Sequence, residues 1–542
     1  MLPALLLCLY FLNQSFSQPL HDFSNSYFSA RLLHDGIAPE TVIFDIYMFN
    51  EYIWGLGYTN ELVDFYVNSP FTLAVFYPFA YINDAYIAKA IFNGLSITCF
   101  LLTLVLFARN HLKKDAWLLL FVPLLFYVPI RNQILFGQSY FIVLFLVVLG
   151  FSFLKKNQFQ FGSGLLSFTI LLKFFPVFYG IPLLAQKRWK AILWGVTLTA
   201  VLCGLGIAIT GPELWKQYFF DVLPHTMQSK TATDYRFTYQ SLDVFFKTIF
   251  IQDAYYNPEV WQASDKMYAI ANWATKGLVI GSAVYATLQK KKDLFTVLAI
   301  WVTALFILQS RTATYAQILW MIPLAAIYKL EVSIKLKVTF AVLLFLVCNL
   351  PFHRLGGLPV LVQFSRLWIV LLLAILFYWG SVKKFSLKSV LIAFILLFPL
   401  HLEVMRANTQ DKSQYVLAKK EHFMVYDFSV HVPPEASADS RRLEPMALDE
   451  AQEKKQLVYN VIGRVSGKNL ATGINVNSFD ENAITIKEHQ LFFGDRQLTY
   501  NISLKKKPVL VNGCQVYFLT DHHSRRAAFT IKVIDICDDM HY

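Results

Sequence analysis

The stretch ILFGQSYFIVLFLVVLGFSFL, residues 134–154, contains no charged side chain and is long enough to cross a lipid bilayer as a helix. Similar apolar runs, some of them shorter, recur at roughly 1–17, 86–108, 117–130, 160–172, 174–186, 191–210, 268–288, 294–309, 312–329, 336–351, 365–380 and 388–403. Of the 542 residues, 56% are hydrophobic and only 15% are charged, which exceeds what one soluble core would bury. We therefore predict an α-helical polytopic membrane protein with about 13 transmembrane helices.

The basic residues lie in short clusters between these runs, so the formal net charge of +12 indicates membrane topology and excludes nucleic acid as a partner. Thirteen crossings that start inside place all six clusters on the cytoplasmic side, at 109–114, 155–156, 187–190, 290–292, 329–337 and 383–388. Two long loops, 18–85 and 211–267, then face outward together with the C-terminus. Residues 1–17 have the length of a signal peptide but no basic start, and we interpret them as the first spanning helix.

The region after residue 404 has a different pattern. Apolar and polar residues alternate over 498–504 and 529–533, which is typical of half-buried strands and predicts a small β-sandwich or barrel. Cys514 and Cys537 lie in this region and could form a disulfide outside the cytoplasm. Residues 433–455 are charged and poor in large apolar side chains, as in a flexible loop. We expect a transmembrane domain at 1–403 and an extracytoplasmic β-rich domain at 404–542.

Asp22 follows the first apolar run by a few residues, at the outer membrane surface. A charged residue next to the apolar part of a membrane is costly, so it usually has either a structural or a chemical role. As a structural residue, Asp22 would be the N-cap of the helix that begins in HDFSNSYFSARLLHDG, residues 21–36. As a chemical residue, it would be a catalytic base. The local sequence alone favours the cap.

Three isolated cations, Arg131, Lys173 and Arg311, end or interrupt apolar runs on the outer face. Each could extend to lipid phosphate, or the three could converge on a phosphate or pyrophosphate ligand. His225 and Gln240 lie in the second outer loop, where a lone histidine is more often structural. The sequence has no zinc-type Cys/His spacing and no DxD-type acidic cluster, so we expect no metal and no cofactor.

Several stretches resemble glycosyltransferase family 87, the polytopic GT-C enzymes that use polyprenyl-phosphate sugars. They are HDFSNSYFSARLLHDGIAP (21–39), NSPFTLAVFYPFAY (68–81), FGQSYFIVLFLVVLGF (136–151), GSGLLSFTILLKFFPVFYGIPLLAQKRW (162–189) and TYQSLDVFF (238–246), and they match that family's first outer loop, its Y-P-P portion, its G-Q helix, its K-x-x-P hairpin and its N-Q-S-L segment. The resemblance covers roughly residues 18–330. At RTATYAQILW (311–320) this chain departs from the serine, tryptophan and histidine of many members, and its C-terminal domain matches nothing in the family core.

The resemblance implies a GT-C-like fold and an inverting hexosyltransferase that moves mannose or another hexose from a polyprenyl-phosphate donor. It implies Asp22 as the general base, because that residue matches the aspartate of the family's first loop. Acceptors would be a glycolipid, a glycan or a protein, and the site would face outward from the bacterial inner (plasma) membrane. The candidate substrate-binding residues are Arg131, Gln138, Lys173, His225, Gln240, Arg311 and Tyr315.

The aromatic residues of the first outer loop have two interpretations. Their rings could stack on sugar faces or form an interfacial belt, and they are Phe23, Tyr27, Tyr47, Tyr52, Trp54 and Tyr58. If Asp22 is not the base, Asp45 and Asp64 of the same loop are the next candidates. Other functions also stay open at this point: an O-antigen-type ligase or polymerase, a lipid or sugar transporter, or a membrane-anchored binding module.

Overall fold

The computed structural model describes residues 1–223 except 45, 59–60, 62, 64 and 66–67, and residues 239–391 except 252–259, 291–292, 356–357 and 383–389. In the C-terminal region it describes 427–429, 456–465, 468–475, 479–480, 482–487, 490–499, 505–520 and 528–537. His225, Asp45, Asp64 and the predicted loop at 433–455 lie outside the described residues.

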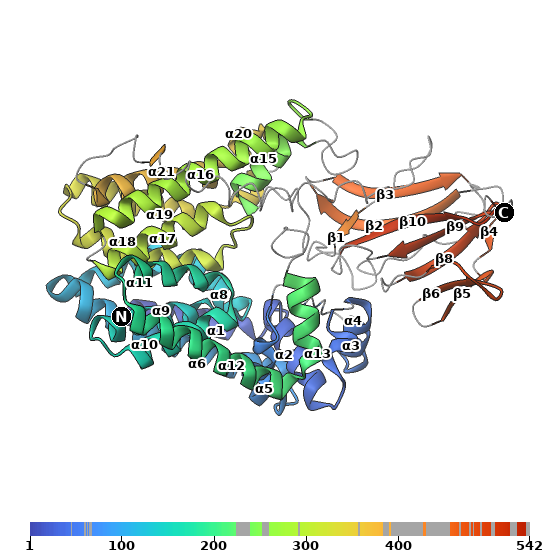
Figure 1. Ribbon diagram of the computed structural model, residues 1–542, viewed down its shortest axis with the longest axis horizontal. Helices are drawn as coiled ribbons and strands as arrows, with labels where there is room; N and C mark the ends of the chain where they lie inside the picture. The colour runs from blue at the N-terminus through green and yellow to red at the C-terminus, as the bar shows by residue number, and fades with distance from the viewer. Residues whose placement is uncertain are drawn as a thin grey trace.

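The N-terminal part of the chain is helical (Figure 1). Its first helices are α1 (Leu2–Ser15), α2 (Asp22–His34), α3 (Pro39–Val42), α4 (Ile46–Gly55), α5 (Phe71–Ala80) and α6 (Ala85–Phe107). They are followed by η1 (Ala108–Leu112), η2 (Lys113–Phe121), α7 (Val122–Leu125), α8 (Tyr127–Leu135), α9 (Tyr140–Lys155), α10 (Phe159–Leu172), η3 (Phe175–Gly180), α11 (Ile181–Ala185), α12 (Trp189–Thr210), α13 (Pro212–Gln217) and η4 (Tyr218–Val222). The later ones are α15 (Leu242–Phe250), α16 (Asp265–Lys290), α17 (Leu294–Leu308), η6 (Tyr315–Trp320), α18 (Met321–Lys329), α19 (Ile334–Asn349), η7 (Phe352–Leu355), α20 (Val360–Gln363) and α21 (Ser365–Ser381).

Few of the helices are long enough to cross a bilayer. Within the described residues, Ala85–Leu125 and Trp189–Thr210 are long and apolar enough, and the pair α8 and α9, bent by 114°, would make a third. The count of about 13 crossings is therefore not confirmed. At 1.5 Å per residue, helices of the length of α10, α17 and α21 fall short of a hydrocarbon core of about 30 Å. The run 174–186 contains Pro176 and Pro182 and forms η3 and the short α11 instead of one helix.

The helices have two apolar cores. The larger is the interior of the bundle and includes residues of α1, α6, α8, α9, α16 to α19 and α21. The smaller joins α2, α4 and α5 to the start of α6, and it also includes Leu214 of α13 and Tyr218 and Val222 of η4. The beginnings of the two predicted outer loops therefore pack together on one face of the molecule.

Helix α2 is fixed to the junction of α5 and α6 by polar contacts from its middle and from its last turn. Tyr27 donates its hydroxyl to the Ile82 carbonyl at 2.6 Å. Arg31 donates to the Ala80 carbonyl at 3.0 Å and to the Asp35 carboxylate at 2.9 Å. These bonds hold α2 at a defined angle beside the bundle, which matters because Asp22 is its first residue.

The C-terminal region is β-rich, as predicted, and lies on the same side of the bundle as α2, α4 and α13 (Figure 1). Its strands are β1 (Asp427–Ser429), β2 (Gln456–Val465), β3 (Lys468–Asn475), β4 (Phe479–Asp480), β5 (Ile484–Lys487), β6 (Gln490–Phe493), β7 (Arg496–Gln497), β8 (Lys505–Val511), β9 (Gln515–Thr520) and β10 (Ala528–Asp535). They form antiparallel sheets of order β1-β10-β9-β8-β4, β2-β3 and β5-β6-β7.

Two of the predictions for this region are confirmed, and a third is not confirmed at the residues that the structure describes. The strand predicted at 529–533 lies within β10, and Cys514 and Cys537 form a disulfide with a Cα–Cα distance of 5.2 Å. The disulfide ties the turn before β9 to the end of β10. The alternating stretch 498–504 is not a strand at residues 498–499, its other residues lie outside the described ones, and β7 and β8 flank it.

Candidate active site

Asp22 is the first residue of α2 and does not cap it. The N-cap is His21, with φ of 51° and ψ of −138°, and no side chain provides a capping bond there. The interpretation of Asp22 as an N-cap is therefore wrong. Its carboxylate turns instead toward the bundle, where Oδ2 accepts a hydrogen bond of 2.5 Å from Nε2 of Gln138.

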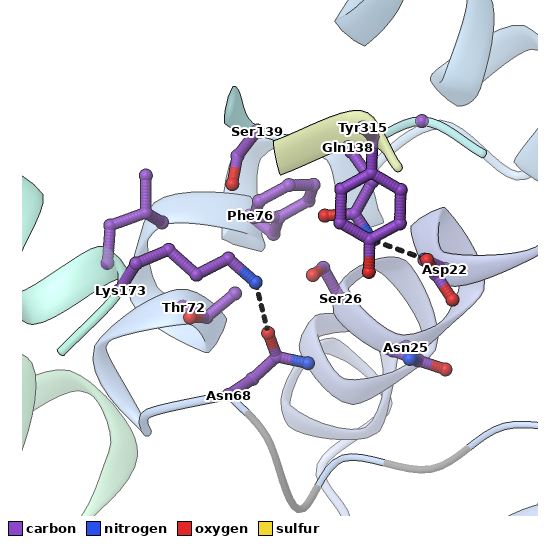
Figure 2. Close-up of a pocket in the computed structure, with 12 residues that line it drawn as sticks. Asp22, Asn25, Ser26, Asn68, Thr72, Phe76, Gln138, Ser139, Lys173 and Tyr315 are labelled. Carbon is purple, nitrogen blue, oxygen red and sulfur yellow. Dashed lines mark hydrogen bonds between the residues drawn. The ribbon is translucent and has the colours of Figure 1, made fainter. Parts of the chain in front are cut away.

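A cavity of about 70 Å³ opens beside this carboxylate (Figure 2). Its lining is mostly polar and comes from α2, α5 and the segment before it, the α8–α9 break, the end of α10 and the start of η6. The residues are Asp22, Asn25, Ser26, Asn68, Thr72, Phe76, Gly137, Gln138, Ser139, Leu172, Lys173 and Tyr315. In Figure 2, Asp22 and Lys173 extend toward the cavity from opposite sides.

The sharp bend between α8 and α9 brings Gln138 to the cavity. Gly137 has a φ of 63°, which favours glycine, and a Cβ atom at this position would lie 2.6 Å from Cβ of Phe23. The amide of Phe23 also donates to the carbonyl of Phe136 at 2.9 Å. The bend and the start of α2 therefore fit together through backbone contacts, and this contact sets the position of Gln138 relative to Asp22.

Lys173 ends α10 with an extended backbone and is the cation of the cavity lining. Its Nζ atom donates to Oδ1 of Asn68 at 3.2 Å and lies 6.0 Å from the centre of the Tyr140 ring. Burial lowers the pKa of this amine, and the negative charge of Asp22 opposes the shift. The cavity thus holds one acidic and one basic group that attract each other.

The electrostatics of Asp22 suit a proton acceptor. Burial raises the pKa of its carboxyl above the ordinary value of 3.8, and this effect is the largest. The hydrogen bond from Gln138 and the positive charge of Lys173 lower that pKa, and Tyr315 and Lys89 lower it by smaller amounts. A carboxylate whose pKa is raised toward neutrality is a better general base than an exposed one, because it binds the transferred proton more strongly.

The structure brings four of the predicted site residues together and places three others elsewhere. Asp22, Gln138, Lys173 and Tyr315 line the one cavity. Tyr315 also packs its ring against the rings of Phe136 and Tyr140, at 6.2 and 5.4 Å.

Three other candidates are described and do not line this cavity. Arg131 is exposed on α8, and the Arg311 guanidinium lies 5.5 Å from the centre of the Tyr239 ring. Gln240 is buried, donates to the Gln363 carbonyl at 2.6 Å and accepts from the backbone amide of Arg366 at 3.1 Å. Its contacts join the second outer loop to α20 and α21, and its predicted role in substrate binding stays a prediction.

The aromatic residues of the first outer loop differ in their burial and in their hydrogen-bond partners. Phe23 and Tyr27 are buried in the smaller core, against each other's rings, and neither lines the cavity. Stacking on a sugar is therefore not supported for these two. Tyr52 donates its hydroxyl to Asp35 at 2.7 Å, and the Tyr58 hydroxyl accepts from the amide of Ala85 at 3.1 Å. The side chains of Tyr47 and Trp54 lie outside the described residues.

Sequence reasoning missed the neutral polar lining of the cavity. Asn25 and Ser26 follow Asp22 by three and four positions, which is the spacing of one helical turn and was a readable signal. Thr72 is buried, and its hydroxyl has no hydrogen-bond partner among the described residues. A buried polar atom without a partner is costly, so a bound molecule that bonds to Thr72 would remove that cost.

The fit between Gly137 and Phe23 gives a first prediction. We expect Gly137→Ala to destabilise the protein by about 1–3 kcal/mol, because the new methyl group overlaps Phe23 and the backbone must leave a positive φ. Thermal unfolding in detergent measures this. The control is Gly204→Ala in α12, where no atom lies within 4 Å of the added Cβ, and which should be neutral or slightly stabilising. Equal midpoints for the two variants would contradict the packing argument.

Part of this chain is similar to a known protein family. Residues 66–313 match the model of glycosyltransferase family 87. The match agrees with the family that the motifs resemble, and the first of those motifs, at 21–39, precedes the matched residues. Together with the apolar helices, the match indicates a membrane-associated glycosyltransferase. Comparisons with curated proteins and with solved structures gave no match.

The matched segment of family 87 covers most of the cavity. It contains Asn68, Thr72, Gln138 and Lys173, whereas Asp22 precedes it. Asp22 reaches the family segment through the contacts of α2 with the α8–α9 bend described above.

Proposed function

We propose that this chain is an inverting hexosyltransferase that moves mannose or another hexose from a polyprenyl-phosphate donor to an acceptor outside the cytoplasm. One observation carries the proposal: the carboxylate of Asp22 and the amine of Lys173 line the same cavity, in a chain whose residues 66–313 match family 87. Inverting transfer needs a base for the acceptor hydroxyl and a cation near the departing phosphate, and the cavity offers one of each.

The reaction would proceed as a single displacement. The acceptor oxygen attacks the anomeric carbon while Asp22 takes the hydroxyl proton, and the bond from that carbon to the phosphate oxygen breaks. The electron pair stays with the polyprenyl phosphate, whose growing negative charge Lys173 stabilises. Gln138 donates to Asp22 and holds the carboxylate at a fixed angle, so that its other oxygen faces the acceptor.

The neutral lining would bind the sugars. Asn25, Ser26 and Thr72 provide amide and hydroxyl groups that can both donate and accept, as sugar hydroxyls require. Arg131 and Arg311, which lie outside the cavity lining, stay predicted ligands of phosphate, and His225 stays a predicted contact of the second outer loop.

No specific observation favours another function. An O-antigen-type ligase or polymerase would use arginines of the outer loops to bind pyrophosphate, but Arg31 is bonded to Asp35, Asn83 and the Ala80 carbonyl. A lipid or sugar transporter would not need a carboxylate and an amine in a cavity of this size.

The proposed orientation places the cavity and the β-rich region outside the cytoplasm of a bacterial inner membrane. It is supported by the six basic clusters and by the packing of both outer loops in one core. We expect a reporter that is active only outside the cytoplasm to be active when fused after residue 404 and inactive at residues 157 and 291. Activity in the opposite sense at these positions would reverse the orientation and place Asp22 on the cytoplasmic side.

Mass spectrometry of membrane glycolipids and glycoproteins, from cells with and without the protein, tests the function. We expect one glycolipid or glycoprotein class to lose a single hexose when the protein is absent. It should regain that hexose with the wild-type chain and not with Asp22→Asn. An unchanged glycan profile would contradict the proposal.

A further inference from the structure

A buried pair of opposite charges holds the turn that precedes Asp22. Glu61, which is 5% exposed, accepts a hydrogen bond of 2.8 Å from the backbone amide of Leu20. Lys89 of α6, which is 1% exposed, donates a hydrogen bond of 2.8 Å to the carbonyl of Pro19. The two side chains thus bind neighbouring backbone groups of the segment between α1 and α2.

Burying a pair of opposite charges usually lowers the stability of a protein. Each ion loses its hydration on burial, and their mutual attraction and the two backbone bonds only partly offset that loss. Here the pair acts on a backbone that is already unusual, because His21 has a positive φ. A turn of this kind persists when its surroundings fix it from several sides. Asp22 follows immediately, so any movement of the turn would move its carboxylate.

We propose that Lys89 and Glu61 form a buried clamp that fixes the turn 18–21 and thereby positions the carboxylate of Asp22 in the cavity. The clamp bonds to the backbone that precedes α2. Gln138 and the carbonyl of Phe136 bond to α2 itself, at the carboxylate of Asp22 and the amide of Phe23. Lys89 and Glu61 are positioning residues, since neither lines the cavity. The inference rests on the proposed role of Asp22 in transfer.

The clamp also acts on Asp22 through charge. The groups that face this carboxyl are Lys173 at the end of α10, Tyr315 of η6, Tyr140 of α9 and Lys89 of α6, with His21 next to it in the chain. Burial raises the pKa of Asp22, and the positive charge of Lys89 lowers it. Glu61 is the negative partner of Lys89 and partly cancels that charge.

Substitutions of the two clamp residues should therefore shift the pKa of Asp22 in opposite directions. In Lys89→Met the positive charge is lost, so the pKa of Asp22 should rise. In Glu61→Gln the side-chain oxygen that bonds to Leu20 is kept but the negative charge is lost, so the pKa of Asp22 should fall. A purely structural pair would disturb the fold in both variants without shifting this pKa in opposite directions.

The pKa of Asp22 is measured by infrared titration of the protonated carboxyl band, with the full chain in lipid nanodiscs. The band is assigned as the one that disappears in Asp22→Asn. Lys89→Arg should leave the pKa near its wild-type value, and Lys216→Met, which removes an exposed lysine beside Glu213, should not change it. Shifts of the same sign in Lys89→Met and Glu61→Gln, or no shift in either, would overturn the proposal.

The experiment gives a result even if one variant fails to fold, and it does not depend on an assay of sugar transfer. If Lys89→Met does not fold, Glu61→Gln still tests the sign, because it keeps the backbone bond, and an unchanged or higher pKa there would also overturn the proposal. The titration needs no substrate. A failure of the proposed function, seen as normal transfer by Asp22→Asn, is therefore distinguishable from a failure of the clamp, seen as a wrong shift.

Discussion

Asp22→Asn should lower turnover by about 100-fold or more and leave the protein folded, because it removes the proposed general base and little else. Asparagine has nearly the same shape, and its oxygen can still accept from Gln138. Asp22 makes no capping bond, so α2 should lose little stability. The variant should still bind donor, since Lys173 and the neutral lining are intact.

Initial rates of transfer by wild-type and variant protein in nanodiscs measure this effect. Asp35→Asn is the matched control, because Asp35 lies just after the same helix but bonds to Arg31 and Tyr52 instead of lining the cavity. The control should lose stability and keep its turnover. Transfer at the wild-type rate by Asp22→Asn would remove the catalytic assignment, and Asp45 and Asp64 would be tested next.

The pH dependence of turnover follows from the same group. The base acts only when its carboxyl is deprotonated, so turnover should be lost as the pH falls through the pKa of Asp22. Because burial raises that pKa, the loss should occur above the ordinary carboxyl value of 3.8.

Lys173→Met should weaken the use of a polyprenyl-phosphate donor by about 10 to 1000-fold, because a charge-assisted contact to a leaving phosphate is worth on the order of 1.5 to 4 kcal/mol. Methionine keeps the length and the apolar stem of lysine, so the packing against Tyr140 should survive. The measured quantity is kcat/KM for the donor.

Arg131→Met is the informative comparison for Lys173→Met. Both cations were predicted on the outer face, but only Lys173 lines the cavity, whereas Arg131 is exposed on α8. If the cavity is the phosphate site, Arg131→Met should change donor use far less. Equal losses of kcat/KM for the donor in both variants would mean that the phosphate binds to a wider area of the outer face. Unchanged kcat/KM in both variants would contradict the proposed phosphate site.

The sequence located the main charged groups of the cavity because they lie in recognisable motifs. Asp22, Gln138 and Lys173 belong to three motif segments, and the structure brings them together. Asn68 and Thr72 were missed because their role depends on how the start of α5 and the residues just before it pack on the end of α10, and no local pattern encodes that contact. Position on the outer face also does not determine the direction of a side chain, so Arg131, Arg311 and Lys173 were equivalent in the sequence.

Local chemistry explains why the capping role of Asp22 was wrong and why the number of crossings is not confirmed. A carboxylate at the start of a helix is favourable at the N-cap and in the first turn alike, and only the backbone geometry at His21 separates the two positions for Asp22. The predicted number of crossings is not confirmed, because an apolar run does not specify a continuous helix. Proline and 3₁₀ turns shorten several runs, as in η3 and η6.

The most direct test of the account is a donor assay with purified protein in nanodiscs and a membrane lipid extract as acceptor. Labelled polyprenyl-phosphate mannose, glucose and galactose are compared with the corresponding nucleotide sugars, and the products are analysed by mass spectrometry and by nuclear magnetic resonance of the anomeric centre. The account predicts transfer from one lipid-linked donor, with inversion at the anomeric carbon. Transfer from a nucleotide sugar, or retention of the anomeric configuration, would contradict it.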